Sequence, residues 1–136
     1  MKNIFVYGSL MFDDVWNRVV QHRYEKQPAV LQRYKRLSVK GKTYPGLVKS
    51  FNSKVEGVVY FDITAQDIRR LDKFEGKYYR KMPVKVLCAN GYKVSARAYV
   101  FNRRYRRLLG TSKWDPAQFQ VHHLHKFIAR YQGFDA

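Results

Sequence analysis

The dipeptide Asn90-Gly91 constrains the fold most, because it separates two runs, Tyr78–Ala89 and Tyr92–Phe101, in which apolar and polar residues alternate. Alternation with a period of two is typical of strands that bury one face. An Asn-Gly pair between such runs favours a type I′ turn, whose twist matches that of antiparallel strands. The two runs therefore predict a β-hairpin and argue against a regular alternation of strands and helices.

Further strands are predicted where β-branched and aromatic residues cluster between turn-forming residues. Lys2–Tyr7 is the first such cluster. Pro28 opens an extended region in which we expect two or three strands, with breaks at Gly41 and at Tyr44-Pro45-Gly46. Lys54–Ile63 is another strand, and its Gly57 indicates a bulge or a close approach of a second backbone segment.

Two helices are predicted from capping residues and from the spacing of apolar side chains. The first is capped by Asp13 or Asp14 and extends to about Gln21. The second begins at Thr64, in a capping box that has an aspartate where glutamate is usual, and it stops at Gly76.

A third helix is predicted near the C-terminal end of the sequence. Asp115 is the expected cap, Pro116 suits the first helical position, and Gly133 ends the helix. The buried face of this helix is expected to hold Phe119, Leu124, Phe127, Ile128 and Tyr131.

Strands outnumber helices, so we expect an α+β fold with a mostly antiparallel sheet, either open or closed into a barrel. The 136 residues suit a single domain spanning residues 1–136. A chain that is 46% hydrophobic and 16% aromatic is too apolar to be disordered.

The single cysteine, Cys88, excludes an internal disulfide and fits a reducing compartment. It lies within an apolar strand, which favours a small core residue over a nucleophile. No apolar run of about 18 residues is present, and the opening apolar segment is too short for a signal peptide. We therefore expect a soluble, cytoplasmic protein without a membrane partner.

The formal net charge of +17 is unusually high. Such a charge attracts anions and nucleic acid non-specifically, although base-reading elements are needed for sequence specificity. A basic surface also simply keeps a protein soluble. The basic residues are mostly scattered, and the one dense run is Arg103–Arg107.

The tetrapeptide Tyr7-Gly8-Ser9-Leu10 follows the first strand and is a candidate substrate loop. Glycine permits backbone angles that bring successive N–H groups together into an anion-binding nest. The alternative is an ordinary turn between a strand and a helix.

Glu75 is the candidate acid–base residue. It stands in the last helical turn, where the helix dipole disfavours a carboxylate by about 0.3–1 kcal/mol. The apolar neighbours on its helix favour desolvation and a raised pKa, whereas Lys73, Lys77 and Arg80 oppose that shift. The alternative is a solvated glutamate that pairs with one of these cations.

Three histidines, His122, His123 and His125, are close in sequence, but no cysteine or carboxylate stands nearby at ligand spacing. We therefore expect ordinary helix-surface histidines and no metal site.

Four segments in order, FVYGSLM, YPGLV, VEGVVYFDI and LDKFEGKYYRKMPVKV, resemble the γ-glutamylcyclotransferase-like (AIG2-like) family. The resemblance covers Ile4 to Phe101, within residues 1–101. Residues 102–136, a basic segment and a helix, lie outside it. It implies a small mixed, mostly antiparallel β-barrel with flanking helices, and a pocket between the Tyr7–Leu10 loop and Glu75.

In this family the loop backbone holds the glutamyl group and the glutamate at position 75 transfers the proton. The implied reaction releases 5-oxoproline from a γ-glutamyl amine or peptide without a metal or organic cofactor. The LDKFEG context favours the γ-glutamylamine branch. Tyr79 and Tyr99, on neighbouring hairpin strands, are candidates to line the pocket.

Two alternatives are open besides this enzyme. The same scaffold suits a non-catalytic module that binds a small carboxylate ligand. The charge and the Arg103–Arg107 run suit a nucleic-acid-associated protein. The oligomeric state is not indicated by the sequence.

Overall fold

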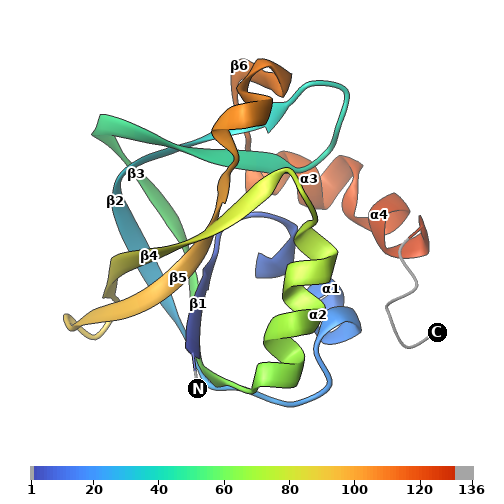
Figure 1. Cartoon of the computed structure of the whole chain (residues 1–136). Coiled ribbons are helices and arrows are strands. Elements are labelled where there is room, and N and C mark those ends of the chain that lie inside the picture. The colour runs from blue at the N-terminus through green and yellow to red at the C-terminus, as the bar shows by residue number, and fades with distance from the viewer. Residues whose placement is uncertain (1, 131–136) are drawn as a thin grey trace.

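A computed structural model describes residues 2–130. Its six strands form one sheet in the order β3-β1-β5-β4-β2-β6, and an additional pairing of β3 with β2 closes five of them into a barrel (Figure 1). The strands are β1 (Lys2–Val6), β2 (Lys26–Val39), β3 (Pro45–Ile63), β4 (Tyr79–Cys88), β5 (Lys93–Phe101) and β6 (Leu109–Lys113). Only β1 and β5 pair in parallel, so the predicted α+β fold with a mixed, mostly antiparallel barrel is confirmed.

The helices gather on one side of this barrel (Figure 1). They are α1 (Asp13–Val19), α2 (Ala65–Glu75), α3 (Pro116–His122) and α4 (Leu124–Arg130). Of the two 3-10 helices, η1 (Ser9–Met11) follows β1, and η2 (Arg103–Leu108) lies beside β6, apart from these four helices (Figure 1). Val15, Trp16, Ile68 and Leu71 form a buried cluster with Ile4 of β1. This packing fixes α2 against the barrel and therefore fixes where its C-terminal end lies.

The hairpin around Asn90-Gly91 is confirmed, but its turn is not type I′. That turn needs positive φ at both central residues, and Asn90 is not among the non-glycine residues with positive φ. The Gly91 N–H donates to the Cys88 carbonyl at 2.9 Å, and only Gly91 has a left-handed φ, of 91°. The loop is therefore a tight turn over Ala89 and Asn90, followed by a left-handed glycine.

The extended region folds as two long strands, β2 and β3. Lys54–Ile63 is the second part of β3 and not a separate strand. A register shift between Gln32 and Tyr34 divides the β2–β3 pairing. At Gly57 a Cβ atom would lie 2.3 Å from the Val6 carbonyl oxygen, which confirms the predicted close approach. Strand β6 has no counterpart in the sequence-based prediction.

The caps of the first two helices differ from the prediction. Phe12 is the N-cap of α1, which ends at Val19, and neither Asp13 nor Asp14 is a cap. The Thr64 Oγ1 accepts the Asp67 N–H as predicted, at 3.2 Å. The Thr64 N–H, however, donates to the Tyr24 hydroxyl, so the capping box is only half formed.

The predicted C-terminal helix is divided at His123 into α3 and α4. The Asp115 cap is confirmed by its bond from the Ala117 N–H at 2.9 Å. Phe119 is buried, while Leu124, Phe127 and Ile128 are half-buried against the core. The predicted positions Tyr131 and Gly133 lie outside the described residues. Within residues 2–130, no helix combines the length and apolarity needed to cross a membrane.

Candidate active site

A cavity of about 430 Å³ lies where the segment after β1, the C-terminal end of α2, the start of β3 and α4 meet. All the candidate site residues line it: Tyr7, Gly8, Ser9, Leu10, Glu75, Tyr79 and Tyr99. The rest of the wall consists of Phe5, Val6, Gly41, Lys42, Thr43, Tyr44, Pro45, Lys73, Phe74 and Phe127. Residues far apart in the sequence therefore meet at one site, as the resemblance implied.

Two hydrogen bonds hold the Tyr7–Leu10 loop in place. The Tyr7 hydroxyl donates to the backbone carbonyl of Tyr99, and the Arg36 Nη1 donates to the Tyr7 carbonyl at 2.7 Å. A Cβ atom at Gly8 would lie 3.0 Å from the Pro45 ring. A side chain here would therefore press against Pro45 on the opposite cavity wall.

The loop leaves several backbone donors unused. Ser9 and Leu10 open the 3-10 helix η1, and the first N–H groups of a helix have no intrahelical acceptor. In residues 2–130 the N–H groups of Gly8, Ser9 and Leu10 make no hydrogen bond. Three consecutive cavity-lining residues therefore have N–H groups free to bind an anion.

Glu75 is the last residue of α2 and is half-buried in the cavity wall. Its carboxylate receives no hydrogen bond from the part of the chain that the structure describes. Burial, and secondarily the negative charge of Asp72, raise the pKa of Glu75 from 4.5 to about 8. The predicted desolvation is thus confirmed, and the nearby cations named from the sequence do not cancel it.

The surroundings of Glu75 are rich in tyrosine. The Tyr79 hydroxyl donates to the Pro45 carbonyl at 2.5 Å, and the Tyr99 hydroxyl donates to Asp72 Oδ1 at 2.7 Å. Burial is the main cause that raises the pKa of both phenols, and Glu75 adds to it. Both tyrosines therefore stay neutral. Because each phenolic O–H is already engaged in a hydrogen bond, these residues offer the cavity a fixed aromatic surface.

Several functional neighbours were not found from the sequence. Asp72 stands three residues before Glu75, a spacing that puts both on one helix face and that could have indicated their coupling. Arg36 carried no such signal. Its guanidinium lies 5.3 Å from the Trp114 ring, and Trp114 donates from Nε1 to the Thr43 carbonyl at 2.7 Å. These contacts tie the Tyr7–Leu10 loop to the opposite wall of the cavity.

The other candidate residues do not line the cavity. His122, His123 and His125 are exposed, and no group of three metal-ligating side chains occurs within the described residues. Cys88 is buried among core residues of the barrel, where burial raises its thiol pKa. Cys88 is therefore a core residue, as the sequence indicated.

Fold and site together define a class: a small mixed β-barrel with a proton-binding carboxylate and free backbone amides in one cavity. The chain belongs to the family described as "Gamma-glutamyl cyclotransferase, AIG2-like", whose sequence model matches residues 4–116.

Named relatives and solved structures are similar over nearly the whole chain. AIG2-like protein D of Arabidopsis thaliana is 33% identical, over 98% of this chain and 89% of the relative. An Arabidopsis thaliana protein solved in solution superimposes with a TM-score of 0.73 at 32% identity, covering 95% of this chain and 78% of that one. A structure named "Gamma-glutamyl cyclotransferase" has a TM-score of 0.66 at 18% identity, covering 96% of this chain and 99% of that chain, and shows the fold alone.

Proposed function

We propose that this protein is a γ-glutamyl cyclotransferase that releases 5-oxoproline from a γ-glutamyl amine or peptide, with Glu75 as general acid and base. The observation that carries the proposal is the Glu75 carboxylate, which has a pKa of about 8 inside a cavity. A group with a pKa near the working pH transfers protons in both directions most effectively.

The reaction begins with a proton transfer for which the Glu75 pKa is suited. The α-amine of a γ-glutamyl compound is protonated at neutral pH and is not a nucleophile in that form. A peptide α-ammonium group has a pKa of roughly 8, and the free α-carboxylate of a γ-glutamyl compound raises the pKa of its ammonium group above that value. Because the pKa of Glu75 is itself raised to about 8, its carboxylate takes this proton at a smaller free-energy cost than a solvated glutamate would.

The freed amine nitrogen then attacks the γ-carbonyl carbon and forms the new C–N bond of the five-membered lactam. Negative charge develops on the carbonyl oxygen, and the unused N–H groups of Ser9 and Leu10 are the donors assigned to it. Holding the glutamyl chain folded back on itself supplies proximity that contributes several kcal/mol.

The tetrahedral intermediate collapses when the bond to the leaving nitrogen breaks. Glu75 returns its proton to that nitrogen. It then takes the second proton from the attacking nitrogen and passes it to the released amine, which departs as an ammonium ion. The products are 5-oxoproline and the released amine. Water takes no part in the bond changes, so one carboxyl group suffices.

The test is 5-oxoproline release from a panel of γ-glutamyl amines, amino acids and peptides, comparing the wild type with Glu75→Gln. Glutamine preserves the shape of the side chain but cannot exchange the proton. We expect turnover to fall by about 10²–10⁴-fold with unchanged circular dichroism. Near-normal turnover of Glu75→Gln on any substrate that the wild type cleaves would overturn the assigned role.

A second candidate is a binding module for small carboxylates. It is favoured by the same pKa, because at pH 7 Glu75 is mostly protonated and can donate a hydrogen bond to an anionic ligand. Calorimetry on the same panel separates the two functions. Tight binding without 5-oxoproline from any compound supports the module.

A further inference from the structure

Positive charge is concentrated in two segments that contain no acidic residue. Residues 26–55 hold eight lysines and arginines, and residues 76–114 hold eleven, with no aspartate or glutamate in either segment. On the surface of an ordinary soluble protein, positively and negatively charged residues are interspersed. The two segments of this chain differ because they carry positive charge alone.

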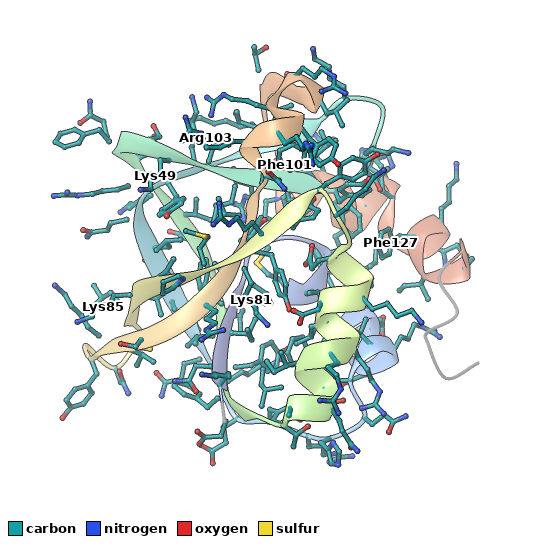
Figure 2. The ribbon with its side chains drawn as sticks, viewed as in Figure 1. Lys49, Lys81, Lys85, Phe101, Arg103 and Phe127 are labelled. Atoms are coloured by element: carbon teal, nitrogen blue, oxygen red, sulfur yellow. The ribbon has the colours of Figure 1, made fainter. Side chains whose placement is uncertain are left out.

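The two segments form most of the barrel wall, whereas α1 to α4 gather beside the barrel (Figure 1). The segments contain β2, the first part of β3, β4, β5, η2 and β6, and β5-β4-β2-β6 are consecutive neighbours in the sheet. The acidic residues of α1 and α2 lie on the helical side (Figure 1). Figure 2 shows Lys49, Lys85 and Arg103 on the side away from Phe127. We call the exposed lysines and arginines of residues 26–55 and 76–114 the basic face.

The densest part of the basic face is η2. Its four arginines, Arg103, Arg104, Arg106 and Arg107, are all exposed. None of them takes part in a salt bridge with another described residue. Their charge is therefore available to a partner in solution.

Two aromatic side chains on the same segments are unusually exposed. Phe51 is 80% exposed and Tyr92 is 72% exposed, although aromatic rings normally bury most of their surface. The Arg33 guanidinium lies 5.4 Å from the centre of the Phe51 ring. An exposed ring beside cations is the arrangement on which unpaired bases stack while their phosphates contact the basic residues.

We propose that the basic face binds single-stranded nucleic acid, with phosphates on its cations and bases on Phe51 and Tyr92. A duplex hides its base faces and would gain nothing from these rings. Lys42 of the basic face also lines the cavity at Glu75, whereas the four η2 arginines, Phe51 and Tyr92 do not. These residues can therefore be changed without altering the cavity wall.

The test is fluorescence anisotropy with a labelled single-stranded oligonucleotide of about 15 nucleotides at about 0.15 M salt. One variant changes the four η2 arginines (Arg103, Arg104, Arg106 and Arg107) to glutamine. The matched control removes the same charge from exposed residues outside the basic face: Arg18, Arg23, Arg69 and Lys126. We expect affinity to fall about tenfold or more in the first variant and less than about threefold in the control. The slope of log K against log salt concentration should become shallower by about 0.7 for each phosphate that the variant no longer neutralises.

A second pair of variants tests the rings. Phe51→Ala and Tyr92→Ala should each weaken single-strand binding by about fivefold or more and leave 5-oxoproline release unchanged. Equal losses of affinity in the η2 variant and its control would reduce the binding to net charge and overturn the proposal. Equal binding of a duplex, or of anionic phospholipid vesicles that compete with the oligonucleotide, would overturn it as well.

Discussion

At the first turn of α2, Asp67 is fully buried and its pKa is about 2, whereas at the last residue of the same helix Glu75 has a pKa of about 8. Burial alone raises the pKa of both carboxyl groups. The helix dipole favours a carboxylate at the first position and disfavours it at the second.

Hydrogen-bond donors account for most of the difference between the two ends. Asp67 accepts from the N–H groups of Gln21 and His22, from His22 Nδ1, from the Tyr24 hydroxyl and from Arg70 Nη1, at 2.5–3.2 Å. These donors outweigh the effect of burial and hold the Asp67 pKa at about 2. Glu75 has no comparable donor in the described structure. One carboxylate is thus locked as a structural anion, and the other remains able to gain and lose a proton.

Removing the locked carboxylate should have the largest effect on stability. Asp67→Ala removes the acceptor of five hydrogen bonds, one of them from Arg70, and breaking a buried charge pair costs about 3–5 kcal/mol. Urea denaturation should show this loss in the free energy of unfolding. Asp14→Ala, at an exposed first-turn position of α1, is the control and should lose less than about 1 kcal/mol. Equal losses would mean that the Asp67 network contributes nothing beyond the helix dipole.

Replacing the titrating carboxylate should act in the opposite direction. Because the folded-state pKa of Glu75 is raised from 4.5 to about 8, the folded protein binds more protons than the unfolded chain in that window. Its stability therefore falls as pH rises from 4.5 to 8. Glu75→Gln removes this loss, so its unfolding free energy should exceed that of the wild type by roughly 2–4 kcal/mol at pH 8.

The same variant should match the wild type in stability near pH 4, where Glu75 is protonated in both states. Urea denaturation at several pH values measures the difference. A constant difference across this range would contradict the raised pKa and would weaken the contrast with Asp67.

The pH dependence of catalysis should follow the Glu75 carboxyl. The acid limb of kcat/KM should rise through about pH 8, because free Glu75 must be ionised to accept the α-ammonium proton. Asp72→Asn removes the second cause of the raised pKa, so it should move this limb to lower pH. The alkaline limb, set by the substrate amine, should stay in place. Movement of both limbs together would indicate that the variant changed substrate binding and not Glu75.

The order and type of most elements follow from local pattern, as the two hairpin strands and the helix ending at Gly76 show. What local pattern missed depends on distant partners. The turn at Asn90 is shaped by the four-residue loop between β4 and β5 and not by the Asn-Gly pair alone. Strand β6 is short, and it is a strand because it pairs with β2, which is distant in the sequence.

The candidate site divides in the same way. Glu75 and the Tyr7–Leu10 loop could be singled out because the family resemblance links them as parts of one pocket. The spacing of residues in the sequence alone does not indicate that link. Most of the Asp67 network was not predictable, because every donor except Arg70 comes from Gln21, His22 or Tyr24, more than forty residues away. Contacts between such distant residues cannot be inferred from a single sequence. From the sequence, Asp67 was therefore predicted only to take part in the capping box.

The redundancy of the Asp67 donors leads to the smallest expected effect. His22→Ala removes the Nδ1 contact at 3.0 Å but keeps the His22 N–H, which donates to Oδ2 at 3.2 Å. The His22 side chain is 52% exposed, so water replaces part of the missing bond. We expect a loss of about 0.5–1 kcal/mol in the free energy of unfolding. The control is His125→Ala, at an exposed position of α4, which should leave stability unchanged. A loss as large as that of Asp67→Ala would show that one donor, rather than the whole set, keeps this end of α2 ionised and unlike the Glu75 end.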